Sequence, residues 1–446
     1  MKNKSLWVNY LVPTCIYLIG LGVAIGFSLN VDYTATSDSK RVYELYSEIV
    51  KTGQWYPIPG ITLSSCVIVI YFPAMLQRLL GTDPLLTYKM IHCIMVSFLP
   101  VVVYFLASKY VGWKYACISV GLLLAHPHSM VVPKIARINI SLTFFALMIL
   151  VMYSDRMRTR YKVPLLAVCS MGIVMSHYGT AYASLFILGV SWLVIMSLYI
   201  CKEVTFRHKN DFTIALCLLI AASTVWLGFV EGTPWRQALG FFENSFKSGQ
   251  FEKHSQAIVV PEKEPIVAPE KEPSEVASIP IIPPSSPSEE LDKKSSIDDT
   301  FFDVSNREQV VQAALGRTLL TSNIPQKVEF VFSWLVVLTL SYGMLVAIKK
   351  KTFSNEYMVI AGVSYLTIVL SVALPHISIY YSVVRVYLHA LVTVGVCFVA
   401  GGIDLSNKLR LKPAVVPLFV LVPYALCTSN ILHQFFGVSR WVAIIE

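Results

Sequence analysis

Long apolar runs separated by short polar loops occupy most of this chain of 446 residues. A helix needs about 20 apolar residues to cross the hydrocarbon core of a membrane, and tilt or a thinner bilayer allows shorter ones. Since 55% of the residues are hydrophobic and 14% are charged, the composition excludes an ordinary soluble globular protein. We therefore predict an all-α fold, a polytopic integral membrane helical bundle of about 11 spans. The predicted spans are 8–29, 85–107, 116–130, 140–153, 163–176, 179–199, 213–230, 328–348, 357–374, 386–401 and 414–432.

The basic residues, which give the chain a net charge of +9, are distributed unevenly. They gather in loops such as 156–162, 202–209 and 349–351, which all fall on one side of the predicted spans. This bias marks the cytoplasmic side of a membrane protein and argues against nucleic-acid binding. We expect a multi-pass protein of the cell (plasma) membrane, with a cytoplasmic N-terminus and a first span that is retained rather than cleaved. The residues placed on the extracytoplasmic side are then Asp38, Arg137, His177, Glu231, His376 and Arg385.

The predicted spans divide the chain into three parts. Residues 1–230 form an N-terminal transmembrane core with a large first extracytoplasmic loop, in which 61–81 is expected to be a helix at the outer interface. Residues 231–327 form an extracytoplasmic loop with a Pro-rich, disordered tether at about 255–300, and residues 328–446 form the C-terminal helices. The nine cysteines show no C-x-x-C spacing, so we predict neither disulfides nor a cysteine-based metal site.

The first extracytoplasmic loop carries a spaced set of charged and aromatic residues. In the order D-x-x-R-x-x-E-x-x-x-E-x-x-x-x-G-x-W they are Asp38, Arg41, Glu44, Glu48, Gly53 and Trp55. This spacing resembles the first loop of GT-C glycosyltransferases, polytopic enzymes that take sugars from polyprenyl-phosphate donors. The elements at 176–178, 311–316 and 385–387 resemble a largely archaeal GT-C-like membrane family in particular. The resemblance covers most of the chain and implies a GT-C-type bundle with interfacial helices in the first loop.

The resemblance also implies roles for the polar residues of the first loop. Asp38 would be the general base that takes the proton from an acceptor hydroxyl, or would orient an acceptor amide. Glu44 and Glu48 would face a similar direction and, with Arg41, would bind the sugar. The competing interpretation is that these residues form a solvated helix face together with Lys51.

A phosphate leaving group needs positive charge at the outer interface. Arg137 and Arg385 each stand at the end of an apolar run, where an ionisable side chain is costly without a partner, and either could bind a phosphate bidentately. Snorkelling to lipid headgroups is the alternative for both. The further substrate-binding candidates are His177, Tyr178 and Tyr381, and a structural role at a turn is the alternative for His177.

One feature departs from the GT-C pattern. Related enzymes often carry a second acidic residue just after the arginine of the third-loop motif, whereas this chain has Asn139 and Leu142. We therefore expect no cofactor and no divalent metal, with catalysis that is metal-independent or recruits Glu231. The expected partners are a polyprenyl-phosphate-linked sugar donor, membrane lipid, an envelope acceptor and a protein partner bound by the Pro-rich loop. The alternatives are a non-catalytic envelope assembly or scaffold protein and a lipid-linked glycan transporter or polymerase.

The predicted topology can be tested by thiol labelling. In a background without native cysteines, a cysteine placed at Arg158 should resist an impermeant thiol reagent in intact cells, because the basic loops face the cytoplasm. A cysteine placed at Ser285 should react. Reversed labelling would contradict the assignment of sides for every candidate residue.

Overall fold

The computed structural model describes residues 10–30, 37–58, 61–132, 135–201, 206–236, 324–373, 383–429 and 431–436. These residues form helices joined by turns and loops, and no β-strand occurs among them. The Pro-rich tether, His376 and Tyr381 lie outside the described residues, and the backbone of Asp38 is described but its side chain is not. The predicted all-α fold is confirmed for the described part of the chain.

The helices follow one another in the order of the predicted spans. The first group comprises α2 (Val12–Asn30), α3 (Ser37–Thr52), η2 (Thr62–Ser65), α4 (Val67–Leu80), α5 (Pro84–Val96), α6 (Phe98–Val111), α7 (Trp113–Ala125), α8 (Ala136–Met152), α9 (Thr159–Ser176), α10 (Tyr178–Ile200), α11 (Lys209–Ser223) and η3 (Thr224–Val230). The second group comprises α16 (Ile324–Lys350), α17 (Asn355–Ala373), α19 (Val383–Lys408), α20 (Val415–Thr428) and α21 (Ile431–Phe435).

Seven segments of the described chain are long and apolar enough to cross a membrane. They are Val12–Leu29, Pro84–Val111, Tyr178–Ile200, Lys209–Val230, Ile324–Lys350, Asn355–Ala373 and Val383–Lys408. The number is lower than the predicted count of about 11, because α7, α8 and α20 have only 10–17 residues. Helix α9 has 18 residues, but its first turn contains Arg160 and Lys162. The long apolar helices identify a membrane-type helical protein.

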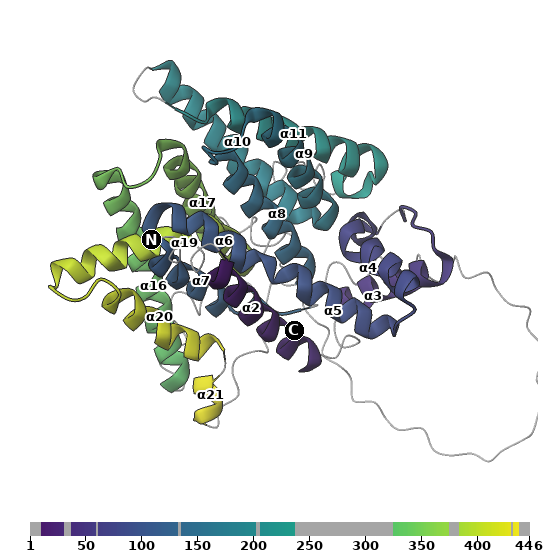
Figure 1. The fold of residues 1–446 in the computed structure, drawn as a ribbon, viewed down its shortest axis with the longest axis horizontal. Coiled ribbons are helices and arrows are strands. Elements are labelled where there is room, and N and C mark those ends of the chain that lie inside the picture. Colours follow the sequence, from purple (N-terminus) through teal and green to yellow (C-terminus); the bar gives the residue numbers. More distant parts are fainter. Residues whose placement is uncertain are drawn as a thin grey trace, which may run out of the picture.

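Helix α19 lies in the interior of the bundle. It packs against α16, α17, α7 and α20, and Figure 1 shows its label among those of α17, α16 and α7. In its most apolar stretch 72% of the residues are buried, against 28% in α10 and in α16. His389, near the start of α19, is therefore buried inside the bundle, and Arg385, one turn earlier, is half-buried.

The first loop is packed onto the bundle by a hydrophobic cluster of its own. Val42, Tyr46 and Ile49 of α3 pack with buried residues of α4, of α5 and of the start of α8. The Tyr46 hydroxyl donates a hydrogen bond to the Pro84 carbonyl oxygen at 2.7 Å, which joins α3 to α5. The segment predicted as an interfacial helix is helical, as η2 followed by α4, and it ends where Gly81 adopts a φ of 64°.

Two glycines bring α16 and α19 into very close contact. A Cβ atom at Gly343 would overlap the carbonyl oxygen of Cys397, and a Cβ at Gly401 would overlap the carbonyl oxygen of Thr339. Small residues commonly make such contacts in membranes, where packing replaces the hydrophobic effect as the force between helices. The contact between α16 and α19 therefore depends on the absence of two side chains.

We expect Gly343→Ala to destabilise the protein by about 1–3 kcal/mol or more, because the added methyl group forces α16 and α19 apart. The matched control is Gly362→Ala in α17, where nothing lies within 4 Å of the added methyl group. Thermal unfolding in detergent measures both. Equal midpoints for the two variants would contradict the importance of this contact.

Candidate functional site

Four polar residues that are distant in sequence meet at the end of the bundle opposite the basic loops. Arg137 lies in the first turn of α8, His177 joins α9 to α10, Arg385 lies in the first turn of α19, and Glu231 follows η3. Arg137 and Arg385 both act electrostatically on His177. Arg137 also hydrogen-bonds to the Cys66 thiol, which interacts in turn with Glu231. We call this group, with Ser64 and His389, the outer site; it unites three of the predicted substrate-binding residues.

His177 is a neutral helix cap in the outer site. Its ring is 4% exposed, and its Nδ1 accepts a hydrogen bond from the backbone N–H of Thr180 at 3.0 Å. Burial lowers the pKa of His177 well below its usual value, and the neighbouring Arg137, Arg385 and His389 lower it further. Since Nδ1 is an acceptor, the neutral ring carries its hydrogen on Nε2. That N–H is the hydrogen-bond donor of the ring, on which Arg137 and Arg385 both act.

Glu231 connects the outer site to the first loop. Both carboxyl oxygens lie 3.1 Å from the Ser64 hydroxyl oxygen of η2. Close by, the indole N–H of Trp226 donates to the Ser65 carbonyl oxygen at 3.0 Å, and its ring stacks on Trp55 with centroids 5.4 Å apart. Burial raises the pKa of Glu231 to about 7, although the hydrogen bond from Ser64 opposes this.

An apolar groove of about 350 Å³ lies between α4, α8 and α9. Its lining is Ile68, Phe144, Ala167, Val168, Met171 and Gly172. Three of these residues follow or precede outer-site neighbours on the same helices. Ile68 lies two residues after Cys66, and Phe144 lies seven residues after Arg137. Gly172 lies five residues before His177. At a rise of 1.5 Å per residue the groove begins roughly 10 Å from the buried arginine. Cationic and apolar binding surfaces are thus adjacent.

The two glutamates of the first loop lie on the exposed face of α3. Glu44 and Glu48 are exposed, Arg41 is half-buried, and the packed face of α3 is formed by Val42 and Ile49. The structure does not describe the side chain of Asp38, so the predicted similar direction of the three carboxylates stays a prediction.

The remaining candidates are placed as follows. The Tyr178 ring begins α10 and lies 5.2 Å from the His177 ring. Asn139 is fully buried and donates to the Ser129 carbonyl oxygen at 2.7 Å, so it fixes the turn before α8. His389, one turn after Arg385 on α19, was missed by sequence reasoning, although the spacing of four residues is a detectable signal. Ser64 was missed as well, and a lone serine before an apolar helix carries no such signal.

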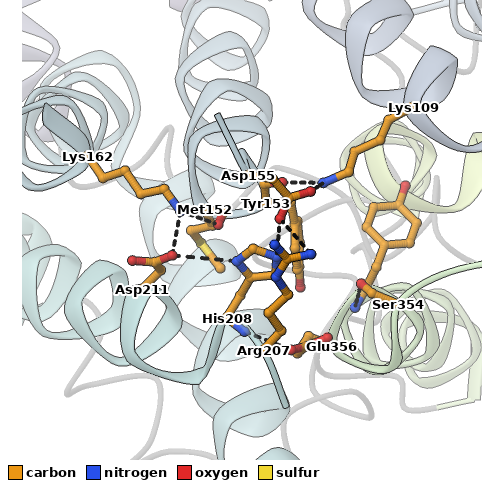
Figure 2. Close-up of polar contacts among 11 residues, drawn as sticks. Lys109, Met152, Tyr153, Asp155, Lys162, Arg207, His208, Asp211, Ser354 and Glu356 are labelled. Carbon is orange, nitrogen blue, oxygen red and sulfur yellow. Dashed lines mark hydrogen bonds and ion pairs between the residues drawn. The ribbon is translucent and has the colours of Figure 1, made fainter. Parts of the chain in front are cut away.

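Figure 2 shows a second polar cluster, at the basic-loop end of the bundle, which we call the ion network. Asp155, in the turn between α8 and α9, lies 3.6 Å from Lys109, 3.3 Å from Arg207 and 3.3 Å from Nε2 of His208. Burial alone would raise the pKa of Asp155, but these three basic groups outweigh it and lower the pKa below its usual value.

The ion network continues through a buried pair. Lys162 Nζ lies 2.5 Å from Asp211 Oδ2, and Nδ1 of His208 lies 3.5 Å from the same oxygen. The backbone N–H of His208 donates to Glu356 of α17 at 2.9 Å. The network therefore joins the ends of α6, α8, α9, α11 and α17, and its carboxylates all have partners within the chain. We assign it a structural role.

No protein-family model matches the chain, and no curated protein is significantly similar to it. Among the residues that the structure describes, no three His, Cys, Asp or Glu side chains are placed to hold a metal ion. The chemistry of the outer site is therefore the basis for a functional proposal.

Within the ion network, Asp211→Asn should destabilise the protein by about 3–5 kcal/mol, because it leaves the Lys162 charge buried without its partner. The side chains of Lys162 and Asp211 are 6% and 15% exposed. Asp155→Asn is the matched control: that side chain is 39% exposed, so we expect a loss of no more than about 1 kcal/mol. Denaturant unfolding in detergent measures both, and equal losses would disprove the assignment of Lys162–Asp211 as the critical pair.

Proposed function

We propose that this chain is a membrane glycosyltransferase of the GT-C type, which transfers a sugar from a polyprenyl-phosphate donor to an envelope glycan, lipid or protein. The proposal includes the topology of about 11 spans, with the outer site on the extracytoplasmic side of the cell membrane. The observation that carries it is a cluster of two arginines and a neutral histidine at the ends of α8, α9 and α19, with an apolar groove further along α8 and α9.

A polyprenyl-phosphate donor has two parts with opposite requirements. Its phosphate needs cationic hydrogen-bond donors, and its hydrocarbon chain needs an apolar surface inside the membrane. The guanidinium groups of Arg137 and Arg385 and the Nε2–H of His177 meet the first requirement. The groove between α4, α8 and α9 meets the second. A free sugar nucleotide would have no use for such a groove.

The transfer step needs a base near the acceptor. In the proposed reaction Asp38 takes the proton of the acceptor hydroxyl, the acceptor oxygen bonds to the sugar C1, and the bond from C1 to the phosphate oxygen breaks. The phosphate oxygen keeps the electron pair, and the arginines stabilise the charge that develops there. Helix α3, which bears Asp38, packs against η2 and so adjoins the outer site.

The other first-loop residues would act on the sugar and the acceptor. Glu44 and Glu48 are exposed at the loop surface, as suits side chains that meet an acceptor arriving from outside. Arg41, Tyr178 and Tyr381 are further candidates for binding sugar hydroxyls. No metal or other cofactor is assigned a role in this proposal.

Two substitutions test the proposal by their contrasting effects. Asp38→Asn should lower the rate of sugar transfer by about 10² to 10⁴ with little change in donor binding, because it removes the base alone. Arg385→Ala should weaken the binding of polyprenyl phosphate itself, since a phosphate contact acts in the ground state as well. The measurements are transfer of labelled sugar from polyprenyl-phosphate sugars to envelope material, and direct binding of the lipid phosphate.

The control for loss of a charge is Lys114→Ala on the basic-loop side, which should behave as the unaltered protein. Normal transfer by Asp38→Asn would refute the catalytic assignment. Binding without transfer in the unaltered protein would favour the transporter alternative, and neither binding nor transfer would favour the scaffold.

A further inference from the structure

Glu231 occupies an unusual position for a carboxyl group. It is 8% exposed and follows η3, a seven-residue π-helical turn at the end of α11. Its side chain contacts the first loop through Ser64, a residue 167 positions earlier in the chain. π-helical turns are rare and frequently occur at functional sites. The contact therefore joins the end of a membrane helix to the loop that bears the proposed base.

The Ser64 hydroxyl has one hydrogen and two acceptors within reach. The Ile61 carbonyl oxygen lies 2.7 Å from Ser64 Oγ, and the two Glu231 oxygens lie 3.1 Å from it. If Ser64 donates to the nearer Ile61 oxygen, Glu231 must be protonated and must donate to the Ser64 lone pair. If Glu231 is ionised, Ser64 turns its hydrogen to the carboxylate.

Both arrangements keep the Ser64 hydroxyl and the Ile61 carbonyl oxygen paired. When Ser64 turns towards Glu231, the Ile61 carbonyl oxygen keeps the backbone N–H of Ser64, 3.2 Å away. Ser64 can therefore follow the loss or gain of a proton at Glu231 without leaving the Ile61 carbonyl oxygen unpaired, which would cost about 1–3 kcal/mol. The Ser64 hydroxyl can donate a hydrogen bond to the Glu231 carboxylate or accept one from the protonated carboxyl group. It can therefore remain the hydrogen-bond partner of Glu231 in both protonation states.

We propose that Glu231 is the general acid of the outer site, with Ser64 as its reversible hydrogen-bond partner. This inference rests on the proposed glycosyl transfer. In that reaction neutral Glu231 gives its proton to the leaving phosphate as the bond between C1 and the phosphate oxygen breaks. The products are the new glycoside, a lipid phosphate monoanion, protonated Asp38 and ionised Glu231. Exchange with water then removes the proton from Asp38 and returns one to Glu231.

The electrostatic surroundings agree with this role. The pKa of Glu231, raised by burial to about 7, lies near that of a phosphate monoester, whose second pKa is about 6. Among the described residues, the Cys66 thiol in the turn before α4 interacts with Glu231, and the same thiol is hydrogen-bonded to Arg137 of α8. Arg236 lies in the same turn as Glu231, beside Gly232.

The sign of the pH effect follows from the raised pKa. Between pH 4.5, the usual value, and about 7 the folded state holds a proton that the unfolded state has lost. Folding stability contributed by this carboxyl therefore falls as the pH rises through that window and changes no further above it.

The test begins with the protonation state of purified protein. Infrared difference spectra between pH 5 and 9 should show the carbonyl band of one protonated carboxyl disappearing with a midpoint of about 7. Glu231→Gln should remove this band. Ser64→Ala should move the midpoint upwards, since the hydroxyl stabilises the carboxylate. Glu44→Gln removes an exposed carboxyl group of α3 and should leave the midpoint of the band unchanged. A band that survives Glu231→Gln, or the absence of any such band, would overturn the proposal.

The second measurement adds polyprenyl phosphate without a sugar. An anion bound beside Glu231 disfavours its ionisation, so saturating lipid phosphate should raise the midpoint of the band. Glu231→Gln should bind the lipid phosphate normally but transfer sugar about 10²-fold more slowly. Lipid binding that leaves the midpoint unchanged would overturn the acid role. If no lipid phosphate binds, the proposed function fails, and the infrared titration still decides whether Glu231 exchanges a proton.

Discussion

A hydrocarbon environment offers no hydrogen-bond partner, so each polar group of this bundle must find its partner inside the chain or lie at an end of the bundle. Within the helices the hydroxyl groups bond back to carbonyl oxygens four residues earlier, as Thr143, Ser170 and Ser176 do at 2.6–2.8 Å. The charged groups are displaced to the two ends. Among the described residues, they include the outer site at one end and the ion network at the other, together with a separate pairing of Asp404 with Lys350 and Lys408.

The two ends use charge in different ways. In the ion network the carboxylates of Asp155 and Asp211 are matched by basic groups, and the buried pair makes the arrangement structural. In the outer site two arginines face a neutral histidine, and the nearby carboxyl, Glu231, has a pKa raised to about 7. The outer site therefore brings two basic side chains together around a neutral imidazole ring. This asymmetry supports a binding role for one end and a stabilising role for the other.

Part of the outer site could be predicted from the sequence, because Arg137, His177 and Arg385 each stand at the end of an apolar run and the runs alternate in direction. The pairing of α16 with α19 could not, since these helices are apolar on most faces and close approach is decided by two glycines. The contact between Ser64 and Glu231 could not be predicted either, because it depends on how the first loop packs. On α3, the spacing of Glu44 and Glu48 indicated a helix but not which of its faces would be buried.

The ion network has a consequence for how the bundle can move. It joins the ends of α6, α8, α9, α11 and α17 on the side opposite the outer site, and the Lys162–Asp211 pair within it is buried. Helices held together at one end can separate only by tilting about that end, so the widest opening occurs at the other. A rigid pivot of this kind would let a bulky lipid enter sideways between α4, α8 and α9 while the opposite membrane surface stays sealed.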